Sequence, residues 1–480
     1  MGKRQSKPEK VHVSYQPKIR PFSREELMRQ ASSLPEDRNE LFLYSLETET
    51  KLDVKNQEML QLLALIPPFM GETPVDLSRF SILGNDADFL DVPHSGCFLP
   101  LFEDSEKATV KAARETVQEM LKDGEGMSTN LSKALGCVFG MASGDALGHT
   151  LEFRPVRYNV ESGDRGYLGE MKGGGKFQLH PGQWTDDTSM GLCIMDSLLM
   201  TGARCDRNVH IIDGFDLMLR FEAWWHLGYN NAFGYDPTRQ PKHSVGLGGN
   251  ISLALKRYIK EGAAVTQAGD KETSGNGSIM RLAPIPVYFW QTPELACKAA
   301  RESSITTHQG EEAAECARLL AHICSTAINL GDKATVESIL GDLGDTFHSD
   351  DERVMFLARA EREPGDDNDR DWRWKGPDYR YAPERSKLQP GYIGSYAMDC
   401  LSMALHCVWT TESFNAAVLK CVNMAGDADT VGSVCGQIAG AIYGFEAVPS
   451  EWVKRIQQWD RNGDIALKTV LLFNQVDLGS

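Results

Sequence analysis

Two glycine stripes constrain the fold of this chain more than any other feature of its sequence. Glycine recurs at every fourth position from Gly136 to Gly148, and again from Gly432 to Gly444. Residues four apart lie on one face of a helix. Because glycine destabilises a helix interior by about 1 kcal/mol relative to alanine, the stripes indicate that another backbone approaches closely. We therefore predict two central helices in tight contact, one leading into Asp145 and the other leaving Thr430.

Helical periodicity continues through most of the chain. From Leu131 onward, apolar residues recur at helical spacing, and alternating strand patterns are scarce. The best strand pattern is short and lies near the N-terminus, at Val11–Tyr15. The predicted helices span residues 131–141, 189–200, 209–226, 251–260, 311–330, 396–409, 413–424 and 431–445. The sequence thus predicts an all-α fold.

Composition shifts divide the chain into three predicted parts. Residues 1–22 form a basic tail, expected to lack fixed structure. Residues 23–129 form a partly helical N-terminal module that starts with a capping box at Ser23–Glu26 and ends near Gly124. Residues 130–476 form the main helical domain, interrupted by a polar insertion at 361–390. The aromatic residues of that insertion could form a lid or a partner surface; the alternative is a solvated surface loop.

Composition and charge exclude several classes of function. Fifty Lys and Arg against 67 Asp and Glu give a net charge of −17, which attracts neither nucleic acid nor an anionic membrane. The 11 cysteines are scattered without a Cys-x-x-Cys pair, as expected for reduced core residues in the cytoplasm. No apolar run reaches the ~20 residues needed to span a bilayer. Gly2 lies in a short match to the myristoylation pattern, but the charged Lys3 favours a disordered basic start instead.

Two acidic strings carry the chemistry: Trp184-Thr185-Asp186-Asp187-Thr188 and Gly426-Asp427-Ala428-Asp429-Thr430. Each combines two carboxylates with threonine hydroxyls, the oxygen ligands that Mg²⁺ and Mn²⁺ prefer. Each string alone is equally typical of a helix N-terminus, where Thr185 could cap the helix that follows. Capping explains one acid but not two, and four carboxylates near one point would repel strongly without cations. If the strings meet in space, the chain is a metal-dependent enzyme.

Six ordered segments of the chain resemble the ADP-ribosylglycohydrolase family, particularly its dinitrogenase-reductase-activating type. Besides the two acidic strings, they are Gly144–Gly148 followed by Glu152-Phe153, Gly275–Pro284, Ser303–His308 and Gly391–Ile393. The resemblance covers roughly Leu131 to Phe445. One departure is Ala425, which stands where many members carry glycine.

The resemblance implies a compact orthogonal helical domain that holds two Mg²⁺ or Mn²⁺ ions. By motif position, the implied metal ligands are Glu152, Thr185, Asp186, Asp187, Asp427, Asp429 and Thr430. Glu152 and Asp187 would act in catalysis, and Asp145 would hold the ligand geometry. The implied substrate contacts are Asn276, Gly277, Ser278, Arg281, His308, Gly391 and Tyr392. Backbone N–H groups of the Gly275–Ser278 loop would bind the pyrophosphate, although the loop alone is equally typical of a tight turn.

The implied activity is hydrolysis of the glycosidic bond between ADP-ribose and a protein side chain, with arginine favoured, which reverses mono-ADP-ribosylation. Such a reaction passes through an oxocarbenium-like state and needs a polarised leaving group and a water. The expected partner is an ADP-ribosylated protein, with no nucleic acid and no stable membrane insertion. One alternative is a binding or immunity module that acts on a partner through residues 1–129. A weaker alternative is a two-metal phosphohydrolase that cleaves the pyrophosphate.

Overall fold

The computed structural model describes residues 108–124, 126–201, 211–239, 243–261, 273–364, 371–381, 383–460 and 463–475. Helices form nearly all of its regular structure, and the only pairing of extended backbone in these ranges is three isolated bridges. The all-α prediction is therefore confirmed. The basic tail, the Ser23 capping box and the Val11–Tyr15 strand lie outside the described residues. The longer α-helices are α5 (Ala108–Asp123), α6 (Thr129–Gly148), α7 (Asp186–Thr201), α8 (Gly214–Leu227), α9 (Gly249–Glu261), α11 (Pro293–Ser304), α12 (Glu311–Leu330), α15 (Glu352–Arg359), α17 (Ala397–Trp409), α18 (Phe414–Asn423), α19 (Ala428–Tyr443), α20 (Ser450–Gln457) and α21 (Asp464–Gln475).

The shorter elements connect these helices. They are η5 (Asn276–Ser278), α10 (Pro284–Tyr288), η6 (Gly331–Lys333), α13 (Val336–Leu340), α14 (Leu343–Thr346), α16 (Arg385–Leu388), η7 (Pro390–Tyr392) and η8 (Phe445–Ala447). Helices α10 and α11 were not predicted, although each has a proline in its first turn, where the missing N–H removes no hydrogen bond.

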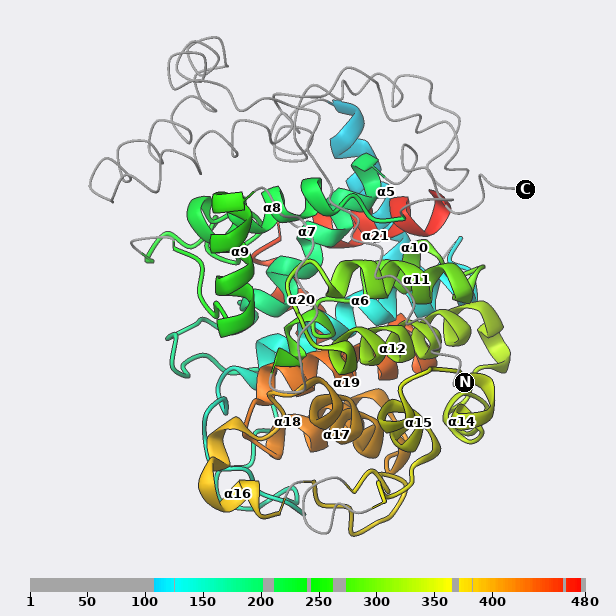
Figure 1. Ribbon diagram of the computed structural model, residues 1–480. Helices are drawn as coiled ribbons and strands as arrows, with labels where there is room; N and C mark the ends of the chain where they lie inside the picture. The colour runs from blue at the N-terminus through cyan, green and yellow to red at the C-terminus, as the bar shows by residue number, and fades with distance from the viewer. Residues whose placement is uncertain are drawn as a thin grey trace, which may run out of the picture.

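Helices α6 and α19 form the centre of the molecule and run antiparallel, side by side (Figure 1). A Cβ atom built on Gly140 would lie 2.6 Å from the carbonyl carbon of Gly436, and one built on Gly144 would lie 2.6 Å from the backbone nitrogen of Ser433. Any side chain at these positions would therefore force the helices apart. The predicted close contact between the two glycine stripes is confirmed.

The other helices pack around this central pair. Helices α12, α17 and α18 contact α19, while α7 and α21 contact α6 (Figure 1). Helix α5, from the predicted N-terminal module, packs on α21 and buries Val117 and Met120. Ser128 then caps α6, because its hydroxyl accepts a hydrogen bond from the Leu131 N–H at 3.2 Å.

Both helices that follow the acidic strings begin three residues earlier than predicted. Helix α7 starts at Asp186 rather than Ser189, and α19 starts at Ala428 rather than Val431. Asp186, Asp187 and Asp429 thus lie in the first helical turns and Asp427 lies at the N-cap of α19, where the exposed backbone N–H groups favour negative charge. This places the carboxylates on rigid elements rather than on loops.

The insertion at 361–390 differs from both predicted interpretations. Trp372, Trp374, Tyr379 and Tyr381 are all buried. The Trp374 indole donates to the Leu357 carbonyl at 2.7 Å, and the Tyr379 hydroxyl donates to Ser402 Oγ on α17 at 2.7 Å. These aromatic side chains are therefore core residues, of which Trp374 and Tyr379 contact α17, and they offer neither a lid nor a partner surface.

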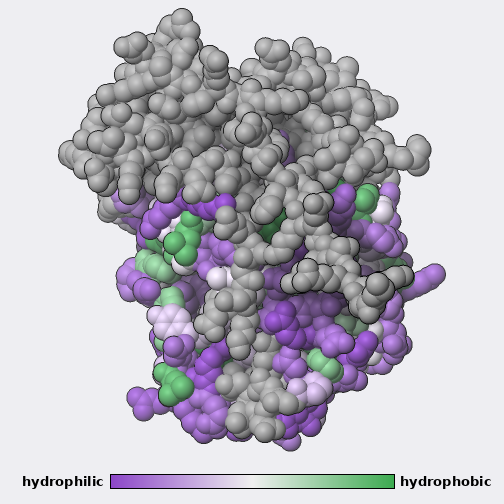
Figure 2. Space-filling view, in the orientation of Figure 1, coloured by the Kyte–Doolittle hydropathy of each residue, from purple (hydrophilic) through white to green (hydrophobic). Residues whose placement is uncertain are grey.

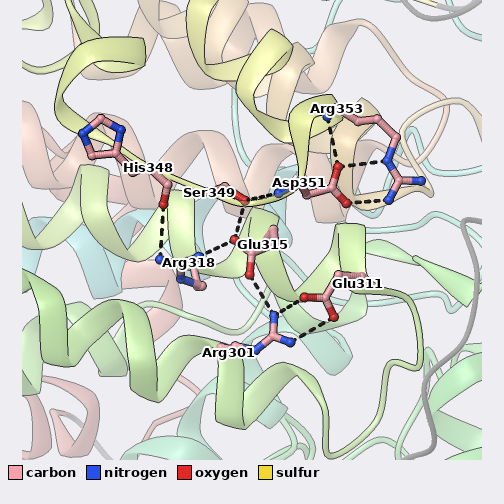
Figure 3. Close-up of polar contacts among 8 residues, drawn as sticks. All are labelled: Arg301, Glu311, Glu315, Arg318, His348, Ser349, Asp351 and Arg353. Atoms are coloured by element: carbon pink, nitrogen blue, oxygen red, sulfur yellow. Dashed lines mark hydrogen bonds and ion pairs between the residues drawn. The ribbon is translucent and has the colours of Figure 1, made fainter. Parts of the chain in front are cut away.

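A network of ion pairs and hydrogen bonds connects α11, α12 and the start of α15 (Figure 3). The buried Glu315 carboxylate accepts hydrogen bonds from Arg301 at 2.8 Å, from the Ser349 hydroxyl at 2.6 Å and from Arg318. Arg301 also pairs with Glu311 at 2.6 Å. The network borders a cavity of about 410 Å³ in which each arginine already has a carboxylate partner.

The described surface is mostly polar. Hydrophobic residues form only separate spots on the face in Figure 2. Leu388, at the end of α16, is the most exposed of the large hydrophobic residues, at 83 %. Within the described ranges, no helix is both long and apolar enough to cross a bilayer.

Candidate metal centre

The first acidic string is organised by a carboxylate from another helix. Asp145, fully buried on α6, accepts hydrogen bonds from the backbone N–H and hydroxyl groups of Thr185 and Thr188, at 2.7–3.1 Å. The first-turn N–H of α7 at Thr188 is therefore satisfied by Asp145 and not by Thr185. The predicted capping role of Thr185 is wrong, because its hydroxyl donates to Asp145 instead. The carboxylates of Asp186 and Asp187 are therefore not needed to cap helix α7.

In the second string, too, the carboxylate at the N-cap position does not cap its helix, α19. Asp427 occupies the N-cap position of α19, but its side chain makes no capping hydrogen bond. Its carboxylate instead accepts a hydrogen bond from the Asn276 amide at 2.8 Å. Asp429, in the first turn of α19, accepts from the neighbouring Thr430 N–H at 2.9 Å.

Packing of the two glycine-striped helices brings Glu152 to the second string. The end of α6 touches the start of α19, since a Cβ on Gly148 would overlap Asp429. Beyond α6, the Phe153 N–H donates to the Gly426 carbonyl at 2.8 Å, and the Gly426 N–H donates to the Arg154 carbonyl at 2.9 Å. Phe153 adopts a left-handed φ of 62° to make this turn, a conformation that costs on the order of 1–3 kcal/mol and often occurs at functional sites.

Three carboxylates converge where these segments meet. Glu152, Asp427 and Asp429 each offer an oxygen within 4.8 Å of the other two. Burial raises the pKa of Glu152 to about 8, with a further contribution from the Asp427 charge. Burial also raises the pKa of Asp186, Asp187 and Asp429 well above the usual range, and neighbouring carboxylates add to the effect. Both acidic strings therefore contribute to one buried negative centre.

Unpartnered oxygens within the centre fit divalent cations. Glu152 Oε2 and Asp187 Oδ1 are buried and accept no hydrogen bond from the protein. An orphaned carboxylate oxygen is costly in a protein interior, and a hard cation would satisfy it. The Thr185 hydroxyl lies beside Asp187, at 3.4 Å from its Oδ2. The Thr430 hydroxyl lies 3.9 Å from Met280 Sδ, and the Thr430 side chain also hydrogen-bonds the Asp427 carboxylate, so it lies beside the centre.

The Gly275–Ser278 loop lies beside this centre and packs against His308. Gly275 and Gly277 pack on the ring of His308, where a Cβ would lie 2.9–3.5 Å from ring atoms. Burial and the charge of Arg281 lower the pKa of His308 to about 3, so the ring is neutral. Its Nδ1 shares a hydrogen bond with the Thr307 hydroxyl at 2.8 Å. The buried Ser278 hydroxyl is without a partner in the protein.

Arg281 differs from its implied role. Its guanidinium is fully buried, lies 4.5 Å from the centroid of the Phe221 ring and donates to the Thr307 hydroxyl at 2.8 Å and to the Ser303 carbonyl at 3.3 Å. These contacts bind it to the segment that supports the loop. We therefore assign Arg281 to positioning His308 and the loop rather than to contact with a pyrophosphate.

Gly391 and Tyr392 lie at the rim, next to the Glu152 turn. Gly391 packs on the Phe153 backbone, and the Tyr392 ring, 56 % exposed, meets the Phe153 ring edge-on at 5.6 Å between centroids. The Lys176 ammonium lies 4.0 Å from the centroid of the same Phe153 ring.

Two features near the centre, Lys176 and Gly246, escaped the sequence-based prediction, and a third, Ala425, is explained by the structure. Lys176, at the rim, comes from a segment with no motif. Gly246 has a φ of +93°, and a Cβ there would lie 2.6 Å from the Asp186 carboxyl carbon. A signal for Gly246 existed in the glycine-rich run 246–249. Ala425, where the resemblance leads one to expect glycine, has a left-handed φ of 59°, which explains why glycine suits this position.

The helical fold agrees with comparisons to known proteins. A sequence model of the ADP-ribosylglycohydrolase family matches residues 127–477. The chain is 32 % identical to the ADP-ribosylarginine hydrolase Tri1 of Pseudomonas putida over 68 % of this chain and 74 % of that protein. It is 27 % identical to the ADP-ribosyl-[dinitrogen reductase] glycohydrolase of Rhodospirillum rubrum, over 68 % of this chain and 90 % of that one.

A solved structure extends the likeness to the fold. A chain of an ADP-ribosylglycohydrolase-related protein complex superposes with a TM-score of 0.53 and 29 % identity, covering 72 % of this chain and 99 % of that chain. This protein belongs to the ADP-ribosylglycohydrolase family. It is an ADP-ribosylglycohydrolase enzyme with an acidic centre built on α6, α7 and α19.

Proposed function

We propose that the protein is a metal-dependent hydrolase that releases ADP-ribose from modified arginine side chains of proteins. The observation that carries the proposal is the cluster of the half-buried Glu152 and Asp427 with the buried Asp429, with Asp186 and Asp187 close enough for the charges to interact. The likeness to ADP-ribosylarginine hydrolases favours arginine as the linkage. The modified protein is the expected partner, and the alternative function for residues 1–129 lies almost entirely outside the described residues.

The donor set divides into two groups that would hold two cations. Glu152, Asp427 and Asp429 would hold one, and Thr185, Asp186 and Asp187 would hold the other, with Thr430 beside them. Bound Mg²⁺ or Mn²⁺ supplies Lewis acidity that orients ribose hydroxyls and lowers the pKa of water. Without cations, the same carboxylates repel one another.

Glu152 and Asp187 carry the proton chemistry in this proposal. Without cations, burial raises the pKa of Glu152 to about 8, and in the proposed reaction the Glu152 carboxyl group acts as the general acid. Glu152 would give its proton to the departing guanidine nitrogen as the bond to the anomeric carbon breaks. The oxygen of water then bonds to that carbon, and its proton returns to a carboxylate of the centre, which restores the enzyme. Asp187, with one oxygen unpartnered, is the second candidate acceptor.

The rim and the loop would bind the rest of the substrate. Gly277 and Ser278 belong to a loop whose small residues leave room for a phosphate near the backbone N–H groups. Gly391 and the exposed Tyr392 lie next to Glu152 through Phe153. His308 supports this loop through its contact with Gly275 and Gly277.

A product assay tests the proposal. The protein is incubated with Mg²⁺ and arginine-ADP-ribosylated protein, and the products are separated by chromatography. Free ADP-ribose is expected. AMP would point to cleavage of the pyrophosphate, and release from serine-linked substrate alone would contradict the arginine assignment.

Single carboxylate variants test the metal assignment. Asp187→Asn and Asp427→Asn should each lower kcat/KM by at least about a hundredfold, because each removes a charged cation ligand. Asp345→Asn, on the exposed face of α14, is the matched control and should retain activity. Full activity of both site variants would refute the metal centre.

A further inference from the structure

Asn276 occupies an unexpected position for a substrate contact. Its side chain, only 8 % exposed, lies in η5 beside the second acidic string. The amide nitrogen donates to Asp427 Oδ2 at 2.8 Å and to the Gly394 carbonyl at 2.9 Å. A carboxamide nitrogen has two hydrogens, so both are used. The reversed amide would place its oxygen against two acceptors, so these contacts fix its orientation.

The backbone around Asn276 is also bound within the protein. The Asn276 N–H donates to the Ser395 carbonyl at 3.0 Å, and the Ala397 N–H donates to the Ser274 carbonyl at 3.0 Å. The same segment, residues 393–397, accepts the Asp427 N–H at the Ile393 carbonyl, at 2.9 Å. Residues 393–397 therefore lie between the Gly275–Ser278 loop and the Asp427 string and are bonded to both.

These contacts exclude one role and favour another. A pyrophosphate needs hydrogen-bond donors, and Asn276 has committed its side-chain and backbone N–H groups elsewhere. Asp427 makes no capping bond to a backbone N–H of its own helix. The Asn276 amide therefore holds its carboxylate from the side of residues 393–397, and the side chains of Asp429 and Thr430 contact it from its own string. A neutral donor suits this place, since another acid would repel Asp427 and a longer cation would fill the space for a metal.

We propose that Asn276 is a positioning residue, which holds Asp427 against residues 393–397 so that its second oxygen faces Glu152 and Asp429. The inference rests on the proposed metal-dependent function. It reassigns Asn276 from the substrate to the ligand shell of one cation. Groups that orient a metal ligand typically change metal affinity by about 10–100-fold when removed.

Measurements of manganese binding distinguish a role of Asn276 in positioning Asp427 from a role in contacting substrate. The Asn276→Leu variant keeps the branching of the side chain and removes both donors. Mn²⁺ is titrated into EDTA-treated, dialysed full-length protein, and free Mn²⁺ is followed by electron paramagnetic resonance. The affinity of one bound ion should fall by about 10–100-fold, while ADP-ribose affinity at saturating Mn²⁺, measured by calorimetry, stays unchanged. Asn250→Leu is the matched control, because the Asn250 amide donates to the Thr273 carbonyl next to the same loop and not to a carboxylate among the described residues.

Each remaining outcome is decisive. Unchanged Mn²⁺ affinity together with weaker ADP-ribose binding would show that Asn276 contacts substrate and would overturn the inference. If circular dichroism shows that Asn276→Leu does not fold, the smaller Asn276→Ser variant is measured with the same expectations. Failure of the proposed function itself is distinguishable, since the unmodified protein would then bind no Mn²⁺ and release no ADP-ribose.

Discussion

Some residues around the centre matter because they lack a side chain, and others because their charge accepts hydrogen bonds. Gly246 is an example, because its positive φ and its contact with Asp186 both exclude a side chain. Asp145 is another, since its buried carboxylate serves the N–H and hydroxyl groups of Thr185 and Thr188 rather than a cation. Neither residue needs to touch substrate to affect the reaction.

The Gly246→Ala variant tests this role. Its methyl group would collide with the Asp186 carboxylate, so we expect Mn²⁺ affinity and kcat/KM to fall by at least about tenfold. Gly248→Ala is the control two residues away, where φ is not positive and the nearest atom to a new Cβ, Ile251 Cδ1, is 3.8 Å distant. Equal activity of the two variants would contradict the assigned contact.

At the scale of helices, the α6–α19 contact determines where the carboxylates of the acidic centre meet. Because the stripes run antiparallel, the C-terminal end of α6, which precedes Glu152, lies against the N-terminal end of α19, which follows Asp427. A change in helix separation would therefore move these two carboxylates apart. Stability and catalysis depend on the same glycines.

Gly140→Ala should destabilise the protein strongly. The new methyl group would overlap the Gly436 backbone, and overpacking against rigid backbone should cost at least about 3 kcal/mol. Urea denaturation measures the loss. Gly249→Ala is the matched control in the first turn of α9, where no atom lies within 4 Å of a new Cβ. A loss below about 1 kcal/mol for Gly140→Ala would show that the helices can separate freely.

The ion-pair network of Figure 3 gives a second prediction at this scale. Glu315→Gln should lower the free energy of unfolding by about 1–3 kcal/mol, because two arginines lose a buried charged acceptor. Glu311→Gln, whose side chain is 53 % exposed, should change it by less than about 1 kcal/mol. Equal effects in urea denaturation would mean that burial does not distinguish the two carboxylates.

At the scale of the whole molecule, the acidic centre should link stability to pH and cations. In the metal-free protein, the pKa of Glu152 is raised from 4.5 to about 8. Between these values the folded state binds more protons than the unfolded state, so stability is greatest at the acidic end and falls as pH rises. Asp186, Asp187 and Asp429 shift in the same direction.

Thermal unfolding with EDTA or Mg²⁺ tests this linkage. With EDTA, the Tm should fall from about pH 5 to pH 8, and Mg²⁺ should reduce the fall because it neutralises the carboxylates. Glu152→Gln should flatten the EDTA profile, since it removes one titrating group and its repulsion of Asp427. Parallel profiles for the unmodified protein and this variant would contradict the raised pKa.

Local patterns predicted much of the fold correctly. The bounds of α12 were predicted without error, because its apolar stripe is long and uninterrupted. The glycine stripes predicted a contact between segments almost 300 residues apart, since spacing alone places each stripe on one helical face. The starts of α7 and α19 were missed by three residues, because acidic first turns resemble loops when read alone.

Roles that depend on partners distant in the chain could not be read from the sequence. Arg281 and Asn276 have the donors expected of phosphate ligands, but Arg281 is fully buried against Thr307, and Asp427 and the Gly394 carbonyl occupy the Asn276 amide. Trp372 and Trp374 stand among charged residues, yet both are buried, and Trp374 contacts α17 and Leu357. Such contacts form only when folding brings distant segments of the chain together.

The sequence by itself determined the residue types of the centre, the two central helices and the family resemblance. The helical period and the spacing of the acidic residues are local properties, so they can be read from the sequence without knowledge of the fold. Tertiary structure decided which carboxylates converge, which hydrogen-bond donors remain free and which aromatic side chains are buried. Those outcomes depend on packing between distant segments, because a donor or a charge changes its role when another part of the chain satisfies it.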